Sequence, residues 1–166
     1  MKVIIVGCGR VGAVLAASFD KSGHEVVILD RVTSSFDKLP STFRGTAVRG
    51  DGTDEDVLRR AGAEDADLFL ALTEGDNRNV MATQLASEAL AAKRVLAKVN
   101  DPVRAAAYAD LGLATICRTN LMEDAVLGFA GLSTDRRPAV VVPQGTHPGG
   151  EHHLTETEPA AVTSEA

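Results

Sequence analysis

Short apolar runs recur along the first 132 residues and are separated by longer stretches of helical composition. Residues 2–6 (KVIIV) form the first run, and their β-branched side chains predict a strand that is buried on both faces. Later runs predict further strands at residues 25–29, 45–49, 66–72, 94–99 and 114–117. The pattern therefore predicts a sheet whose strands are spread over most of the chain.

Helices are predicted between these strands from side-chain spacing and from residues that start or stop helices. They are expected at 13–19, 54–61, 79–90, 102–111 and 120–132, with a short helix within 31–39 that Pro40 ends. Either Thr53 or Asp54 is expected to cap the helix at 54–61. Asp101 followed by Pro102 is expected to start the helix at 102–111, and Asn120 the last helix, in a motif resembling a capping box.

This alternation of strand and helix predicts a parallel sheet with right-handed crossovers, in an α/β, doubly wound, Rossmann-like fold. One domain is expected over residues 1–132. From Ser133 the composition shifts to Pro, Gly, Thr, Glu and Ala, which predicts a linker and a largely disordered tail over 133–166. Only residues 139–142 (AVVV) predict another strand there, at a sheet edge, and residues 143–166 are expected to be disordered.

Charge and composition narrow the class of protein. The chain has 166 residues, of which 45% are hydrophobic, so it can build the core of one domain. Its formal net charge of −6 and the lack of a basic cluster argue against nucleic acid as a partner. No apolar run reaches the ~18 residues that a membrane span needs, and the N-terminus does not resemble a signal peptide. Cys8 and Cys117 lack metal-ligand spacing, which indicates a reduced, cytoplasmic chain.

A glycine-rich turn joins the first strand to the first helix, with the spacing G-x-G-x-x-G. Its residues are Gly7, Cys8, Gly9, Arg10, Val11 and Gly12. In the dinucleotide-binding fingerprint, the first glycine makes the sharp turn, the second admits a pyrophosphate and the third lets the helix pack closely. Free N–H groups of the first helical turn then point at the phosphates. The alternative is a tight turn that binds nothing.

Two charged residues strengthen the nucleotide hypothesis. Asp30 follows the second strand, where a carboxylate can accept hydrogen bonds from ribose hydroxyls. Arg10 stands at a helix N-terminus, where the helix dipole disfavours a cation unless an anion is bound there. The alternative for Arg10 is a side chain that points into solvent.

Further candidates lie where the other strands end, because ligands of such sheets bind at the carboxyl ends of the strands. Asp51, next to Gly52, is expected at a base edge or ribose, Thr73 is expected to hydrogen-bond, and Lys98 offers a second charge for phosphate. For Asp51 and Thr73 the alternative is turn and cap chemistry. For Lys98 the alternative is an exposed strand end.

Residues for catalysis or metal binding are not expected at this edge of the sheet. His24 precedes the second strand and so lies at the wrong end, and Tyr108 is on a helix. His147, His152 and His153 belong to the tail, where a solvated segment is the better interpretation than a metal site. Nucleotide binding without chemistry indicates a sensor.

Four segments together resemble the TrkA-N or RCK nucleotide-binding domain: residues 3–12 (VIIVGCGRVG), 50–54 (GDGTD), 58–73 (LRRAGAEDADLFLALT) and 77–80. The resemblance covers roughly residues 1–132. It implies a cytoplasmic regulatory subunit of a potassium uptake system, or part of the gating ring of a potassium channel. It also implies that NAD(H) or ATP/ADP is bound without turnover.

The resemblance further implies roles for single residues. Arg10 would contact phosphates, Asp30 and Arg31 would lie near the ribose, and Asp51 near the adenine. The family often has arginine where this chain has Lys98, so a contact with a terminal phosphate does not carry over directly. The small ligand-binding lobe that usually follows is not expected within residues 133–166, which are too few and too polar to form it.

The resulting hypothesis is a nucleotide-sensing subunit that reaches the inner face of the membrane through a potassium transporter or channel partner. The alternatives are a small NAD(P)-dependent oxidoreductase and a nucleotide-binding module that regulates another transporter. The predicted helix at 120–132 has more apolar surface, including Phe129, than one face needs. It is expected to pack against another subunit in a dimer or ring, unless it closes the domain's own sheet.

Overall fold

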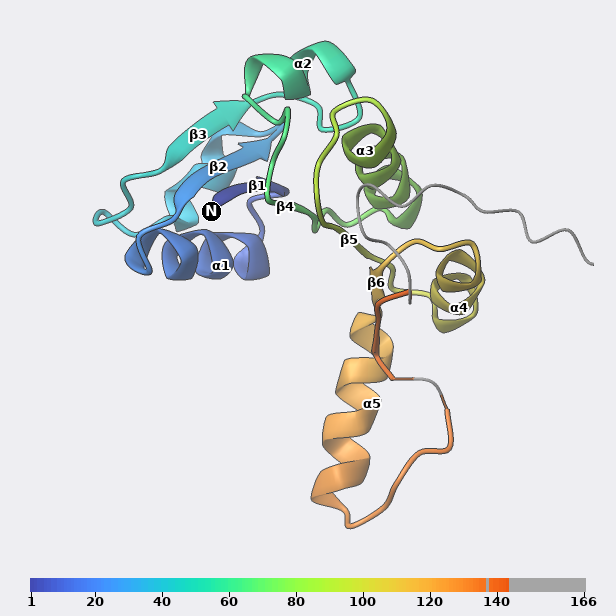
Figure 1. The fold of residues 1–166 in the computed structure, drawn as a ribbon. Coiled ribbons are helices and arrows are strands. Elements are labelled where there is room, and N and C mark those ends of the chain that lie inside the picture. Colours follow the sequence, from blue (N-terminus) through green and yellow to red (C-terminus); the bar gives the residue numbers. More distant parts are fainter. Residues whose placement is uncertain (137, 144–166) are drawn as a thin grey trace, which may run out of the picture.

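The computed structural model describes residues 1–136 and 138–143 (Figure 1). In chain order the elements are β1 (Lys2–Val6), α1 (Arg10–Lys21), β2 (Glu25–Asp30), the 3₁₀ helix η1 (Thr33–Lys38), β3 (Thr46–Arg49), α2 (Glu55–Arg60), β4 (Leu68–Ala71), α3 (Asp76–Glu88), β5 (Val95–Lys98), α4 (Pro102–Asp110), β6 (Thr115–Ile116), α5 (Arg118–Phe129) and β7 (Val140–Val141). The predicted strands and helices are all present, with ends that differ by a few residues.

One sheet of the order β3-β2-β1-β4-β5-β6-β7 organises the described residues. The strands from β3 to β6 pair in parallel, and β7 joins β6 antiparallel at the edge. The predicted doubly wound α/β fold is confirmed. The strand order reverses between β1 and β4, and such a switch point is where a crevice for ligands opens in folds of this type.

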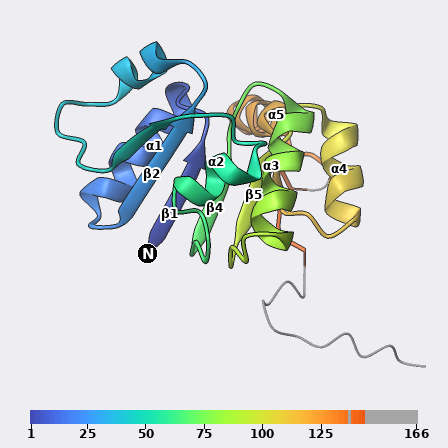
Figure 2. The same cartoon turned by 90° about the horizontal axis from the view of Figure 1, so that it is seen from above.

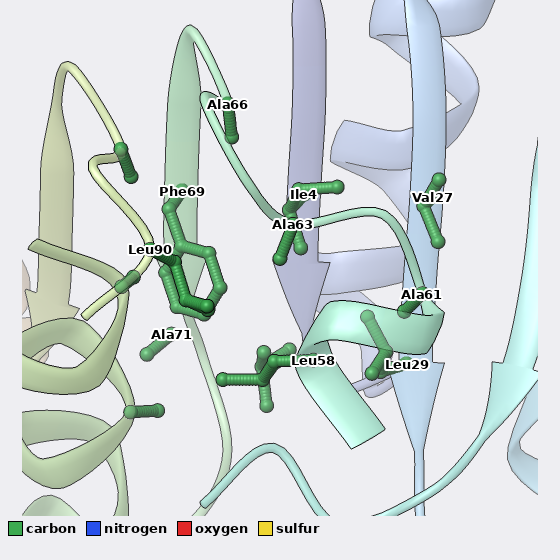
Figure 3. Packing of buried hydrophobic residues seen from close by; sticks show 14 residues of the cluster. Ile4, Val27, Leu29, Leu58, Ala61, Ala63, Ala66, Phe69, Ala71 and Leu90 are labelled. Atoms are coloured by element: carbon green, nitrogen blue, oxygen red, sulfur yellow. The ribbon is translucent and has the colours of Figure 1, made fainter. Parts of the chain in front are cut away.

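The helices cover both faces of this sheet (Figures 1 and 2). α1 covers one face, α2 and α3 cover the other, and α5 projects away from the sheet on the α1 side. On the α2–α3 face, Ile4 and Phe69 of the sheet pack with Leu58 of α2 and Leu90 after α3, as Figure 3 shows. On the α1 face, alternate residues of β1 and β2 pack on small residues of α1 such as Ala16. Strands buried on both faces explain the continuous apolar runs of the sequence.

Acidic caps start two of the helices. The Asp54 carboxylate accepts a hydrogen bond from the Val57 N–H, which settles the alternative between Thr53 and Asp54 in favour of Asp54. The Asp101 carboxylate accepts from the N–H groups of Val103 and Arg104, and Pro102 opens α4 as predicted.

The start of the last helix was predicted wrongly. α5 begins at Arg118, with Cys117 in the N-cap position, so Asn120 lies inside the helix and is 8% exposed. The Asn120 carbonyl accepts a hydrogen bond from Arg136, on the segment that returns from α5. The local sequence resembled a cap, but the chain turns from β6 directly into the helix, and the Cys117 N–H is held by the Ala139 carbonyl.

The segment after α5 returns to the sheet. β7 lies within the predicted strand at 139–142 and at the predicted edge position. The tail from 144 onward, with its three histidines, lies outside the described residues. Within the described part of the chain, no helix is long and apolar enough to cross a membrane.

Candidate functional site

A cavity of about 570 Å³ opens at the carboxyl ends of β1 to β4, next to the reversal of strand order. Its volume is within the range of small-molecule sites. The glycine turn, the ends of β2 and β3, the residues after β4, η1 and the first turn of α3 all contribute to it. The lining residues are Val6, Gly7, Cys8, Gly9, Arg10, Leu29, Asp30, Arg31, Val32, Ser35, Lys38, Gly50, Asp51, Gly52, Leu72, Thr73, Glu74 and Arg78.

Two glycines of the turn are required by the fold itself. Gly7 has φ +107°, a conformation that favours glycine, and a Cβ there would lie 3.0 Å from the Thr73 nitrogen. A Cβ on Gly12 would overlap the carbonyl oxygen of Gly7, so the start of α1 packs directly on the turn. These contacts explain the first and third glycines without any ligand.

Gly9 differs from both. Its φ of −78° is open to any residue, and a Cβ there would meet no protein atom within 4 Å. Gly9 occupies the N-cap position of α1 without a side-chain cap, and the first turn of α1 contains no acidic residue. The backbone N–H groups at the start of α1 therefore face the cavity, and no side chain at the cap position accepts a hydrogen bond from them.

The Asp30 carboxylate ties the end of β2 to the glycine turn. Its Oδ2 accepts a hydrogen bond from the Cys8 N–H at 2.8 Å, and its Oδ1 accepts from the Val32 N–H at 2.9 Å. A carboxylate has about four lone-pair sites, so each oxygen keeps the capacity to accept from a ligand hydroxyl. Burial, and then the nearby Asp30 charge, raise the pKa of the Cys8 thiol. The thiol thus stays protonated at neutral pH.

Asp51 combines turn chemistry with a place in the cavity wall. Its Oδ1 accepts from the N–H of Thr53 at 3.0 Å and from the Thr53 hydroxyl at 2.8 Å. The Arg31 Nε lies 3.6 Å from Oδ2. The Thr53 N–H chiefly, with its hydroxyl, Arg31 and Arg78, lowers the pKa of Asp51. The predicted turn role is therefore present, and it leaves Asp51 at the cavity as an anion.

Most of the predicted site residues meet in this cavity, but three do not line it. Val11 is 58% exposed on α1, and Gly12 packs under the turn. Lys98 lies at the end of β5, where burial and then the Arg118 charge lower its pKa. Its predicted phosphate contact stays a prediction.

The lining residues that sequence reasoning missed include three with polar side chains: Ser35, Lys38 and Arg78. Ser35 and Lys38 belong to η1, which follows Asp30, and Arg78 lies in the first turn of α3, just after Thr73. A helix that follows a strand begins at the strand's carboxyl end, which is the edge of the sheet where ligands of such folds bind. This rule could have identified η1 and the start of α3 as parts of the site. With Arg10 and Arg31, the added cations give the cavity more positive than negative side chains, although the whole chain carries −6.

Comparisons with known proteins identify relatives of this chain. A family described as the TrkA-N domain matches residues 3–119. The chain is 42% identical over 127 residues to the Trk system potassium uptake protein TrkA of Streptomyces coelicolor. The aligned region covers 76% of this chain and 57% of that protein. The chain spans about half the length of this and other curated relatives that it matches.

Two solved structures are similar at the level of the fold and share a quarter of the sequence. The AMP-bound Kef CTD of Shewanella denitrificans has a TM-score of 0.61 and 26% identity, over 79% of this chain and 82% of that chain. GsuK bound to ADP has a TM-score of 0.61 and 25% identity, over 76% of this chain and 32% of that chain. Both of these structures hold an adenine nucleotide, AMP in the first and ADP in the second.

Proposed function

The chain belongs to the TrkA-N domain family, and from that membership we propose that it is a nucleotide-sensing regulatory subunit of a potassium uptake system or channel. In this proposal the cavity binds NAD(H) or ATP/ADP and does not turn the nucleotide over. The nucleotide-bound relatives support the ligand class, and the relative named as a Trk potassium uptake protein supports the role.

The observation that carries the proposal is the open space at Gly9. The fold requires glycine at Gly7 and Gly12, but no protein atom excludes a side chain at Gly9. A ligand that approaches the backbone closely explains the missing Cβ, and a pyrophosphate does so in the dinucleotide-binding fingerprint. The donors at the start of α1 and the Arg10 side chain would then share the phosphate charge.

The adenosine would lie on the side of β2 and β3. Asp30 keeps free lone pairs for ribose hydroxyls while it holds the turn, and Asp51 stands farther along the same edge, at the end of β3. This arrangement assigns one end of the cavity to the nucleoside and the glycine turn to the phosphates. The chain would thus sense nucleotide by occupancy of one continuous site.

Assembly is the second part of the proposal, and α5 supports it. Figure 1 shows α5 extending away from the sheet. Only Asn120 of this helix is buried, Val126 is 57% exposed and Phe129 is 96% exposed. These apolar side chains do not close the domain's own sheet. We assign them to a contact with a neighbouring subunit, in a dimer or ring held at the inner face of the membrane by the transporter partner.

Calorimetry with NADH, NAD, ATP and ADP on the purified protein tests the ligand class. At least one of the four is expected to bind at a 1:1 ratio, and Arg10→Ala should weaken it by about 1.5–3 kcal/mol, the range for a charge-assisted hydrogen bond. Lack of binding by all four would contradict the proposal. Steady oxidation of NADH with any of a panel of carbonyl compounds would favour the oxidoreductase alternative.

A further inference from the structure

Building on the proposed nucleotide site, we propose that Thr73 determines which nucleotide it prefers: a dinucleotide over ADP or ATP. The reason is that the Thr73 hydroxyl donates its proton to the buried Asn79 side chain, so it can only accept a hydrogen bond from a ligand. In this role Asn79 is a positioning residue, and Thr73 is the residue that meets the ligand.

Asn79 lies on α3, is fully buried and joins the carboxyl ends of β4 and β5. Its Nδ2 donates to the carbonyl oxygens of Thr73, at 3.0 Å, and of Lys98, at 2.8 Å. Its Oδ1 accepts from the Thr73 N–H at 2.8 Å. A carbonyl only accepts and an N–H only donates, so these three bonds allow a single orientation of the Asn79 amide.

That orientation fixes the proton of the Thr73 hydroxyl. The Thr73 Oγ1 lies 2.6 Å from the same Asn79 Oδ1, which is an acceptor, so the hydroxyl must donate there. The Oγ1 atom is left with lone pairs only. Thr73 lines the cavity, so any hydrogen bond between its hydroxyl and a ligand must be one that the hydroxyl accepts.

An acceptor at this place discriminates between parts of a nucleotide. A ribose hydroxyl or a carboxamide N–H can donate to Oγ1, whereas an ionised phosphate oxygen cannot. The Glu74 carboxylate also lines the cavity beside Thr73 and adds to this preference, since it too accepts hydrogen bonds and repels a phosphate. The donor-rich part of the ligand is thus expected on this side of the cavity.

The topology places the second half of a dinucleotide here. β1 lies between β2 and β4, so the glycine turn separates Asp30, at the end of β2, from Thr73, after β4. With the adenosine ribose at Asp30 and the pyrophosphate at the turn, the next group meets Thr73. In a dinucleotide that group is the second ribose, in ATP it is a third phosphate, and in ADP it is absent. Lys98, the cation expected for a further phosphate, does not line the cavity, and Arg78, which does, acts on the Asp51 carboxylate and helps to lower its pKa.

Calorimetry with ADP, ADP-ribose, NADH and ATP separates these groups, because ADP-ribose adds only the second ribose to ADP. The wild-type protein should bind ADP-ribose and NADH at least fivefold more tightly than ADP or ATP. Thr73→Val removes the acceptor and keeps the shape of the side chain. It should lower the affinity for NADH and ADP-ribose about fivefold and change the affinity for ADP less than about twofold. Thr73→Ser should behave like the wild type.

Thr83→Val is the matched control. Thr83 is also buried on α3, one turn after Asn79, but its hydroxyl bonds only to the Asn79 and Val80 carbonyls of its own helix. This variant should keep the wild-type order of affinities. A loss seen with NADH alone would still support the inference and would identify the carboxamide, rather than the ribose, as the donor.

Two results would overturn the inference while the proposed function stands: wild-type affinity for ADP or ATP that equals or exceeds that for ADP-ribose and NADH, or equal losses of ADP and NADH in a folded Thr73→Val variant. Melting curves of each variant establish folding, and the wild-type ligand series decides the question even if Thr73→Val does not fold. Failure of all four ligands to bind the wild type would overturn the proposed function and this inference together.

Discussion

The Oδ2 atom of Asp30 lies 2.8 Å from the backbone nitrogen of Cys8, 22 residues earlier in the chain, and accepts its hydrogen bond. The carboxylate proposed to bind ribose therefore also holds the turn proposed to bind phosphate. The two halves of the proposed nucleotide site share one side chain, and disturbing it should affect both.

Asp30→Ala is expected to lower the free energy of unfolding by about 2 kcal/mol, because the N–H groups of Cys8 and Val32 both lose a charged acceptor. It should also abolish nucleotide binding. Urea unfolding and calorimetry check the two effects. Asp37→Ala, which removes an exposed carboxylate from η1, should change neither, and an Asp30→Ala variant of wild-type stability would contradict the structural role.

Gly9→Val should abolish nucleotide binding with a stability change of no more than about 0.5 kcal/mol, because its side chain enters open space. Gly12→Val should instead lower stability by about 3 kcal/mol, since its Cβ would overlap the Gly7 carbonyl. Thermal melts and nucleotide titrations of both variants make the comparison. If Gly9→Val binds nucleotide like the parent, the ligand does not lie at this turn.

NADP is expected to bind at least tenfold more weakly than NAD, because the Asp30 carboxylate would repel a 2′-phosphate. Arg31, the residue able to accept that phosphate, is engaged with Asp51 at 3.6 Å. Asp51→Asn should release Arg31 from this ion pair and reduce the difference in affinity between NAD and NADP. Competitive titration measures both, and equal affinities in the wild type would show that Asp30 does not face the ribose.

The Asp67 carboxylate is expected to make the free energy of unfolding depend on pH in the acid range. The Lys93 ammonium and then the Lys2 N–H lower the pKa of Asp67 from 3.8 to about 2. A depressed pKa in the folded state means that this stabilisation is complete above pH ~4 and is lost as the pH falls toward ~2. Asp67→Asn should flatten the pH dependence of unfolding in that window, whereas Asp37→Asn should leave it unchanged. A wild-type slope in Asp67→Asn would refute the assignment.

Phe129→Glu should convert an oligomer into a monomer that still binds nucleotide, because Phe129 is 96% exposed and far from the cavity lining. Its melting temperature as an isolated subunit should not fall. Val103→Glu, at an exposed position on α4, is the control that should keep the assembly. Sedimentation velocity gives the answer, and a wild-type monomer at high concentration, with and without nucleotide, would exclude this contact.

The sheet and the glycine turn could be predicted from the sequence because their signals are local. A strand buried on both faces is a continuous apolar run, as in residues 2–6, and a turn that needs glycine shows it by spacing. The parallel direction of the strands followed from their alternation with helices. Asp30 and Asp51 could be placed at the cavity because both follow strands that end there.

The remaining features depend on how far side chains reach and on contacts distant in sequence. Lys98 is the last residue of β5, as Asp30 is of β2, but Lys98 does not line the cavity and the charge of Arg118 acts on it, a neighbour that no local pattern predicts. Arg78 lines the cavity because α3 begins three residues after Thr73. Asn120 resembled a helix cap, but α5 begins two residues earlier, after Cys117, whose backbone N–H donates a hydrogen bond to the distant Ala139 carbonyl.

The return of the chain from α5 to the sheet has a mechanical consequence. β6 precedes the base of α5, β7 pairs with β6, and Arg136 on the returning segment bonds to Glu123 and Asp124 of the helix. α5 is therefore held along its first half by the returning segment, and its second half projects from the edge of the sheet. Its 12 residues span about 18 Å, so a tilt of about 10° at the base would move the tip by about 3 Å. A change at the sheet edge too small to alter the fold would thus be amplified at Phe129, the residue proposed to contact a neighbouring subunit.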